Sequence, residues 1–472
     1  MGGSKSRFYA DIMAQHEAVT GSSILVVTKL PNGETIKFAI DFGLFQEEKY
    51  WKHNYEVLFN PEELDFCLVT HNHVDHIGRL PLLAKKGFRK NIYMTKDTSK
   101  LVPLALEDSY KVLKETSKRK NERCLYNKSD VELCLDLIKE VNFEETIYVH
   151  KNVKITFLRN GHLLGAALIL VQISYPEYED INILFTGDYK GENWFFDVPE
   201  LPEWILELPL TIVQESTYGN MNSSEITGNF KQNIINVLEK EKTVIVPVFS
   251  LGRAQEILYL LKTMQDKNEI SKDIPIYLDG KLAIRYTEIY KRNEISIRED
   301  MKNFIPENFS YVSDESRKKI IQEENCKIIL ATSGMGSYGP AQLYIPAFLK
   351  KEGCLIQFTG YVAEGTFGRK LKNAENNTTV SIGGVLVKKK ADVDFTTEFS
   401  AHAKADEMIE FLKKFKNLKL VLLNHGEPEV KIEFAEKIIN EIEPKEIGIL
   451  GRDYFFRINH YGLVKTLGAK FI

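Results

Sequence analysis

Cysteine is scarce in this chain, and long apolar runs are missing. The 472 residues include five cysteines, an odd number without any Cys-x-x-Cys pair. This pattern offers no thiolate zinc site and is typical of the reducing cytoplasm. No apolar run approaches the length of a membrane span, and Met1 to Arg7 lack the apolar core of a signal peptide. We therefore expect a cytoplasmic protein without a membrane partner.

An excess of positive charge is also missing, since the formal net charge is −4. A nucleic-acid partner would therefore have to be held by local positive charge or by bound metal ions. With 43% hydrophobic and 27% charged residues, the composition is that of an ordinary globular protein. The length exceeds what one hydrophobic core normally holds, which indicates two or three domains.

Histidine, by contrast, is concentrated in one place. Residues 71–76 read His-Asn-His-Val-Asp-His and follow an apolar run, Phe66 to Thr70, that is typical of a buried strand. His71 and His73 can face one metal ion, while Asp75 and His76 can reach a second. Imidazole and carboxylate together suit zinc, with manganese or iron as alternatives. The alternative is a solvated polar turn, but it would require three histidines to fall within six residues by chance in a chain that has only ten. We interpret the stretch as a metal site.

Four further acidic or histidine residues stand where predicted strands end. Because such loops can gather at one sheet edge, we expect them to join the same site, with Asp41 orienting ligands and Asp188 able to bridge two ions. The residues and their expected strands are Asp41 (Thr35 to Asp41), His162 (Lys154 to Leu158), Asp188 (Asn182 to Phe185) and His425 (Lys419 to Leu423).

These motifs resemble the metallo-β-lactamase superfamily and, within it, the β-CASP branch of nucleic-acid nucleases. The histidine loop, Asp41, His162 and Asp188 match the superfamily motifs in order. Three marks of the branch follow in the chain: Glu215 within Gln214 to Gly219, His402 within Phe399 to Ala403, and His425 before Gly-Glu. At His425 the chain resembles RNA-processing members, such as ribonucleases similar to the cleavage and polyadenylation specificity factor endonuclease.

The resemblance implies two zinc ions, with manganese as the alternative. One ion would be held by His71, His73, His162 and Asp188, and the other by Asp75, His76, Asp188 and His425. Two such ions, roughly 3.5–4 Å apart, can activate a hydroxide that attacks phosphorus in line.

The implied catalytic residues are Asp75, Glu215 and His402. His402 is not needed as a ligand, so it would protonate the departing oxygen or hold the phosphate, and Glu215 would hydrogen-bond His402. The implied products are a 5′-phosphate and a 3′-hydroxyl.

Three turns after strands resemble stretches of the branch that face the cleft, and we expect their residues to bind RNA phosphate. In this chain they carry Ser250 with Arg253, Ser333 with Gly334, and Arg369. Serine and arginine at a helix start suit a phosphate, although a plain helix cap is the alternative. The chain departs from the family pattern after Gly334, where residues 336–339, Gly-Ser-Tyr-Gly, replace the usual glycine-rich continuation.

The expected fold class is α/β, an αββα metallo-β-lactamase sandwich with an inserted α/β β-CASP domain. The expected domains are residues 1–214 and 378–472 for the sandwich and 215–377 for the insertion. The segment from Pro103 to Val141 is expected to be helical, and Ser129 with Glu132 has the spacing of a capping box at its last helix. Residues from Phe8 to Gln15 depart from the usual opening strand of the family.

Three other functions compete with an RNA nuclease. A small-molecule metallohydrolase would have no use for the long stretch between Glu215 and His402. Only His425 and the general resemblance to RNA-processing members argue against a DNA nuclease of the same branch. A non-catalytic scaffold subunit would have lost ligands, whereas this chain keeps all seven. The mode of cutting, endonucleolytic or 5′–3′ exonucleolytic, stays open, and so does assembly as a homodimer or within an RNA-processing complex.

Overall fold

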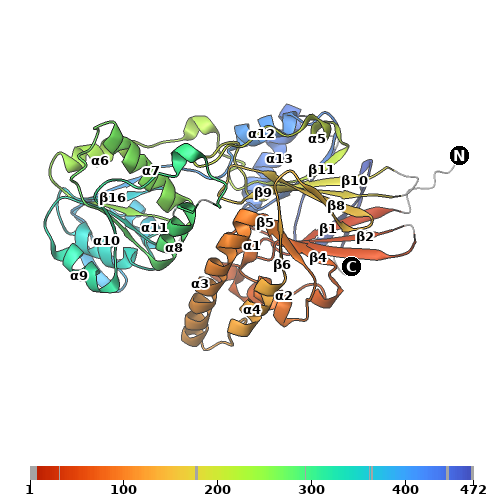
Figure 1. Ribbon diagram of the computed structural model, residues 1–472, viewed down its shortest axis with the longest axis horizontal. Helices are drawn as coiled ribbons and strands as arrows, with labels where there is room; N and C mark the ends of the chain where they lie inside the picture. The colour runs from red at the N-terminus through yellow and green to blue at the C-terminus, as the bar shows by residue number, and fades with distance from the viewer. Residues whose placement is uncertain are drawn as a thin grey trace. The chain divides into compact units, whose positions relative to one another are not determined.

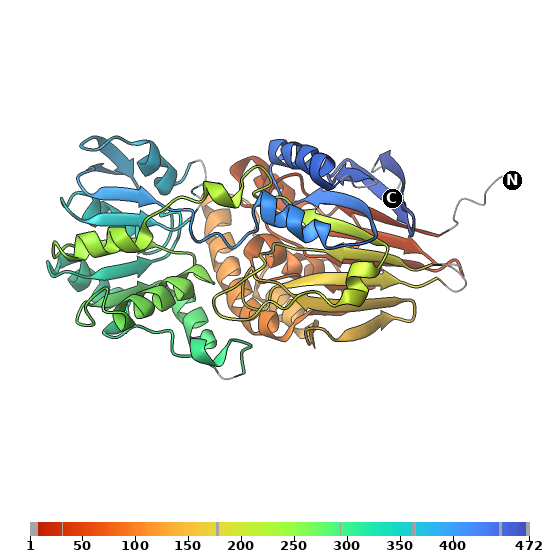
Figure 2. The ribbon, with the colours of Figure 1, turned by 90° about the horizontal axis from the view of Figure 1, so that it is seen from above.

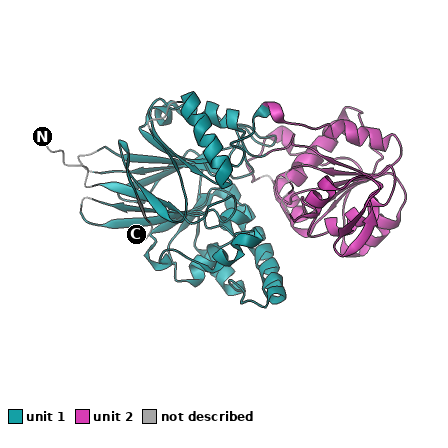
Figure 3. Cartoon of the chain, turned by 180° about the vertical axis from the view of Figure 1, so that it is seen from behind, with its two compact units in different colours: residues 1–223, 401–472 teal, residues 224–400 magenta. Residues whose placement is uncertain are grey.

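The chain forms two compact units (Figure 3). The computed structural model describes residues 8–30, 32–175, 179–292, 294–360, 362, 365–442 and 446–468, so the segment from Met1 to Arg7 lies outside the described residues. Unit 1 comprises residues 1–223 and 401–472, and unit 2 comprises residues 224–400. These edges differ from the expected ones at 214/215 and 377/378. The later edge moves because β19 (Asp392–Phe395) pairs with β16 (Leu355–Phe358) inside the sheet of unit 2.

The first sheet of unit 1 has the strand order β23-β22-β1-β2-β3-β4-β5-β6. The strands from β23 to β3 pair antiparallel, and those from β3 to β6 pair parallel. The residues that were expected to stray from the opening strand form β1, which lies between β2 and β22, so red and blue strands run side by side (Figures 1 and 2). The strands are β1 Tyr9–Ala14, β2 Ile24–Lys29, β3 Thr35–Ile40, β4 Phe66–Leu68, β5 Ile92–Thr95, β6 Ile138–Val141, β22 Tyr454–Asn459 and β23 Gly462–Gly468.

The second sheet of unit 1 has the strand order β21-β20-β11-β10-β9-β8-β7. Its strands from β7 to β10 pair antiparallel, and β10, β11, β20 and β21 run parallel. The strand β9 is buried along its whole length, as its nearly continuous apolar sequence requires. The strands are β7 Thr146–His150, β8 Val153–Arg159, β9 Ala167–Ile173, β10 Ile181–Phe185, β11 Leu210–Glu215, β20 Leu418–Asn424 and β21 Ile447–Ile449.

The two sheets pack face to face, and helices cover both outer faces, which confirms the αββα sandwich (Figure 1). Alternate side chains of each strand, such as Phe38 from β3 and Val171 from β9, fill the space between the sheets. The helices α2, α3 and α4 pack on the first sheet, and α5, α12 and α13 on the second. The helices are α1 Val74–Ile77, α2 Leu80–Lys85, α3 Lys96–Lys120, α4 Lys128–Asp136, α5 Glu203–Glu207, α12 Ala405–Lys413 and α13 Pro428–Ile442, with short 3₁₀ helices η1 Glu48–Tyr55 and η2 Pro61–Glu63.

The prediction of a helical segment from Pro103 to Val141 is wrong at its end. The last four residues form β6, because they find a parallel partner in β5. The capping box of α4 is also two residues earlier than predicted. The Asn127 side chain accepts the N–H of Asp130, and the Asp130 carboxylate accepts the N–H of Asn127. Asparagine and aspartate three residues apart close the same reciprocal pair that Ser129 and Glu132 were expected to form.

Unit 2 is built on a parallel sheet with the order β14-β13-β15-β12-β16-β19. Helices lie on both sides of this sheet, with α6 and α7 above it and α9 and α10 below it in the view of Figure 1. The carboxyl ends of parallel strands meet at one edge, where the loops that follow β12, β15 and β16 also lie. The elements are η3 Ser223–Glu225, α6 Phe230–Leu238, β12 Val244–Pro247, α7 Arg253–Asp266, β13 Ile276–Asp279, α8 Lys281–Tyr290, η4 Glu299–Met301, β14 Phe309–Tyr311, α9 Asp314–Gln322, β15 Ile328–Ala331, α10 Ala341–Leu349, β16 Leu355–Phe358, α11 Phe367–Asn373, β17 Thr379–Ile382, β18 Val385–Lys388 and β19 Asp392–Phe395.

Within these residues, no helix combines the length and the apolar character needed to cross a membrane.

Candidate metal centre

The predicted ligands of unit 1 gather where strands of both sheets end. His71 and His73 follow β4, and Asp75 and His76 lie in α1. His162, Asp188 and His425 follow β8, β10 and β20 of the other sheet. We call His71, His73, His162 and Asp188 the first cluster, and Asp75, His76 and His425 the second cluster. In each cluster the ligand atoms lie within 4.8 Å of one another.

The nitrogens of the first cluster face one another across short gaps. His73 Nδ1 lies 3.1 Å from His71 Nε2 and 3.1 Å from His162 Nε2. Asp188 Oδ2 lies 3.6 Å from His71 Nε2 and 3.8 Å from His162 Nε2. Three imidazoles and one carboxylate thus point at a common centre.

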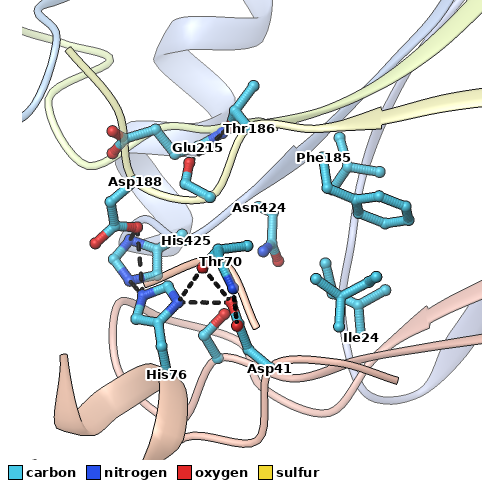
Figure 4. A pocket seen from close by; sticks show the side chains of 14 residues that line it. Ile24, Asp41, Thr70, His76, Phe185, Thr186, Asp188, Glu215, Asn424 and His425 are labelled. Carbon is cyan, nitrogen blue, oxygen red and sulfur yellow. Dashed lines mark hydrogen bonds and ion pairs between the residues drawn. The ribbon is translucent and has the colours of Figure 1, made fainter. Parts of the chain in front are cut away.

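The second cluster faces the other oxygen of Asp188. His76 Nε2 and His425 Nε2 are 3.1 Å apart (Figure 4). Asp188 Oδ1 lies 3.4 Å from His76 Nε2, and Asp75 Oδ2 lies 3.6 Å from His425 Nε2. One oxygen of the Asp188 carboxylate therefore serves each cluster, which is the arrangement of a bridging ligand.

Asp41 and Thr70 fix the orientation of the histidine loop. His76 Nδ1 lies 2.8 Å from Asp41 Oδ2, so this nitrogen donates its proton to the carboxylate and leaves the Nε2 lone pair facing the cluster. Thr70 donates to the same carboxylate from its N–H and its hydroxyl, at 2.8 and 2.7 Å, and Thr70 Oγ1 lies 3.0 Å from His71 Nδ1. Asp41 reaches these partners with a left-handed φ of 59°, which aspartate tolerates better than most residues.

Glu215 and His402 form a pair beside the two clusters. His402 Nδ1 lies 2.9 Å from Glu215 Oε2, and His402 Nε2 lies 3.9 Å from Asp188 Oδ2. The Glu215 carboxylate also accepts the N–H of Tyr189 at 2.7 Å and the hydroxyl of Thr217 at 2.6 Å. The contact expected between Glu215 and His402 is therefore present, and Nε2 is the ring nitrogen turned toward the metal ligands.

Burial keeps the imidazoles of the first cluster neutral. It lowers the pKa of all three, that of His73 to about 4. His402 behaves differently, because burial opposes its charge but the carboxylates of Glu215 and Asp188 raise its pKa to about 9. For Asp75, burial favours the neutral acid, yet a hydrogen bond with His425 and the charge of His76 hold the pKa at about 2.

The donor set fits two divalent cations. Nitrogen lone pairs only 3.1 Å apart repel one another unless a cation or a proton lies between them. The buried Asp188 Oδ1 also accepts no hydrogen bond from the described residues. A buried carboxylate oxygen that accepts no hydrogen bond and faces imidazoles is the environment of a bound cation. Imidazole and carboxylate ligands without thiolate are compatible with zinc or manganese.

The residues expected to bind RNA phosphate all lie in unit 2, at the carboxyl edge of its sheet. Ser250 and Arg253 follow β12, Ser333 and Gly334 follow β15, and Arg369 lies in α11. The Arg253 guanidinium is largely buried and donates to Glu256 and to the carbonyl of Thr359. Of the stretch from Gly360 to Arg369, residues 361, 363 and 364 lie outside the described residues.

Several supporting residues of the site are not among the predicted ones. Thr217 Oγ1 lies 3.1 Å from His425 Nδ1, and the backbone carbonyl of Ala401 accepts the Nδ1 proton of His162 at 2.9 Å. Asn160 accepts the N–H of His162 and donates to the carbonyl of Asp188. Asn160 and Thr70 stand next to predicted motifs, which is the only sequence signal for them, and a backbone carbonyl carries none.

Family models cover most of the chain. A metallo-β-lactamase superfamily domain matches residues 32–190, a β-CASP domain matches 254–371, and a Zn-dependent metallo-hydrolase RNA specificity domain matches 386–449. Ribonuclease TTHA0252 of Thermus thermophilus is 30% identical over 424 residues, which cover 87% of this chain and 91% of that protein. This chain belongs to the β-CASP branch of the metallo-β-lactamase superfamily.

Other proteins similar to this β-CASP chain differ in length. An RNase J-like protein of Methanocaldococcus jannaschii is 29% identical, over 79% of this chain and 84% of that protein. The transcription termination factor FttA of Methanosarcina mazei is 29% identical over 82% of this chain, which spans only 62% of that factor. A solved structure, a protein of unknown function from Enterococcus faecalis V583, matches 96% of this chain with a TM-score of 0.54 and 11% identity, a likeness of fold alone.

Proposed function

We propose that this chain is a zinc-dependent ribonuclease that hydrolyses RNA phosphodiester bonds and leaves a 5′-phosphate and a 3′-hydroxyl. The observation that carries the proposal is Asp188, whose two oxygens face two separate groups of ligand atoms, with the His402–Glu215 pair beside them. Two cations held by one shared carboxylate are typical of enzymes that hydrolyse phosphate esters.

The first cluster would hold one ion, and the second cluster together with Asp188 would hold the other. When bound, the two ions supply a nucleophile at neutral pH and polarise the phosphate. Asp41 accepts the Nδ1 proton of His76, which turns its Nε2 toward the centre, and Thr217 Oγ1 lies 3.1 Å from His425 Nδ1 and helps to hold that ring. Asp75 completes the second cluster with a charged oxygen.

His402 acts as the general acid in this proposal. Its Nδ1 proton is held by Glu215, so Nε2 is the nitrogen that can give a proton to the oxygen leaving phosphorus. Glu215 accepts from Tyr189 and Thr217 as well as from His402, and it stabilises the imidazolium before the transfer.

RNA is the proposed substrate because two comparisons support it. The relatives named above include ribonucleases. The family model that matches residues 386–449 is that of a Zn-dependent metallo-hydrolase RNA specificity domain. We also propose that the native ions are zinc. A cytoplasmic location agrees with the five cysteines, which are all free.

A cleavage assay tests the proposal. Protein loaded with zinc is given an RNA oligonucleotide and its DNA counterpart, each labelled internally and at the 5′ end. We expect cleavage of RNA and not of DNA, and fragment sizes then separate internal cutting from cutting at the end. The His402→Ala variant should keep both zinc ions and lose most turnover. Full activity in that variant would remove the acid role of His402, and cleavage of DNA alone would refute the RNA assignment.

A further inference from the structure

Unit 2 displays two exposed aromatic side chains in the loops that follow the neighbouring strands β12 and β15. Tyr338 is 67% exposed and Phe249 is 39% exposed. The Phe249 ring packs so closely on Gly334 that a Cβ there would lie 2.8 Å from the ring. Tyr338 is bound to the neighbouring Ser333, which donates its N–H to the Tyr338 carbonyl at 3.0 Å. Both residues therefore lie beside the Ser333–Gly334 turn, Phe249 through its ring and Tyr338 through its backbone.

The loop that carries Tyr338 is held firmly in place. The Tyr338 N–H donates to Ser333 Oγ at 3.3 Å, and the hydroxyl of Ser337 accepts the N–H of Phe367 at 2.8 Å. Gly336 and Gly339, on either side of Tyr338, have positive φ values of 74° and 62°. A Cβ on Gly339 would lie 2.8 Å from the carbonyl of Thr332. A side chain on so constrained a backbone loses little conformational freedom when it binds a partner.

The two loops that carry the rings are uncharged, and the neighbouring helix α11 is basic. The loops 248–252 and 332–340 contain no aspartate or glutamate, and neither does the segment 365–373, which carries Arg369, Lys370 and Lys372. That segment is tied to the loop of Tyr338 by a hydrogen bond from the Gly368 N–H to the Met335 carbonyl at 3.0 Å. In a chain with a net charge of −4, this is a local concentration of positive charge.

We propose that Tyr338 stacks on an unpaired RNA base, with Phe249 beside the same turn and the cations of α11 near the backbone phosphates. Exposed aromatic rings in a basic environment are the means by which proteins hold single-stranded nucleic acid without reading its sequence. The inference rests on the proposed ribonuclease function and adds a specificity-determining residue to it.

The test compares binding and cleavage in four full-length, zinc-loaded proteins: the wild type, Tyr338→Ala, Tyr338→Phe and the control Tyr461→Ala. Tyr461 is 71% exposed and lies in the turn between β22 and β23 of unit 1. The probe is a single-stranded RNA with phosphorothioate linkages, which slow cleavage, and with 2-aminopurine, whose fluorescence falls on stacking. The same strand in a duplex is the second probe.

Tyr338→Ala should weaken binding of the single strand by roughly fivefold or more, the smallest loss expected for one base–aromatic stack. It should also reduce the quenching of 2-aminopurine, raise KM and leave kcat unchanged, while duplex binding stays the same. Tyr338→Phe should match the wild type, because stacking needs the ring and not the hydroxyl, and so should Tyr461→Ala.

Three results would overturn the stacking role: single-strand affinity unchanged in Tyr338→Ala, equal losses for single strand and duplex, or a Tyr338→Phe variant as weak as Tyr338→Ala. In each of these cases a wild type that cleaves RNA leaves the proposed function standing. A wild type that neither binds nor cleaves RNA would overturn both proposals.

Discussion

Thr217 links the second cluster to the Glu215–His402 pair, and its hydroxyl offers a sharp test of the site. Thr217 Oγ1 donates to Glu215 Oε2 at 2.6 Å and lies 3.1 Å from His425 Nδ1, which also lies 3.2 Å from Asp188 Oδ1. Thr217→Val keeps the shape of the side chain and removes both hydrogen bonds. His425 Nδ1 then keeps only its contact with Asp188 Oδ1, 3.2 Å away, so the ring is held less firmly in the second cluster.

The expected magnitude follows from the two lost hydrogen bonds. At about 0.5–1.5 kcal/mol each, their loss costs about 1–3 kcal/mol. If this cost falls on the metal-bound state, the affinity of one ion drops roughly 5- to 150-fold, since 1.4 kcal/mol is a factor of ten. In other metalloproteins, loss of a residue that orients a metal ligand lowers metal affinity or activity by about 10- to 100-fold, which is in the same range. The ion held by the first cluster should keep its affinity, because Thr217 bonds to none of its imidazoles.

Competition with a chromophoric zinc chelator measures the two affinities separately. The wild type and Thr217→Ser, which keeps the hydroxyl, should release zinc alike, whereas Thr217→Val should release one ion more readily and the other as before. Unchanged affinity for both ions in Thr217→Val would refute the orienting role of the hydroxyl. A Thr217→Ser variant as weak as Thr217→Val would show that packing, and not hydrogen bonding, matters at this position.

Two further predictions concern stability. A Cβ on Gly43 would lie 1.5 Å from the Asp75 carbonyl, so Gly43→Ala should destabilise the fold by about 1–3 kcal/mol or more and lower its zinc content. Thermal unfolding with Gly191→Ala as the control, where the added Cβ meets nothing within 4 Å, checks this, and equal melting temperatures would contradict it. Removal of zinc by a chelator should lower the melting temperature of unit 1 by several degrees, since zinc at a thousandfold its Kd contributes about 4 kcal/mol. The metal-ligand groups found among the described residues all lie in unit 1, so calorimetry should show the unit 2 transition unmoved, and a shift of both transitions would argue against this.

The sequence allowed the ligands to be predicted because each follows a short apolar strand. His71, His162, Asp188 and His425 come directly or within a few residues after β4, β8, β10 and β20, so their positions depended only on recognising strand ends. The order of the strands in the sheets was not needed for that step. The capping box of α4 and the strand β6 were missed for the opposite reason. Local sequence offers more than one possible helix start and does not show where the helical segment ends. The structure places the capping box at Asn127, and pairing with β5 makes the last four residues a strand.

The residues that orient the ligands were out of reach of such reasoning, because their partners are set by strand pairing. β11 and β20 are parallel neighbours, with Glu215 opposite Asn424 at their ends, and this pairing brings Thr217 and His425 together across 208 residues of sequence. The carbonyl of Ala401 meets His162 in the same way, across 239 residues. Both contacts join residues 1–223 of unit 1 to its second segment, residues 401–472. The chain can therefore complete its second cluster only after residues 401–468 have paired with the earlier strands, and metal binding is tied to the closure of the whole sandwich and not to the histidine loop alone.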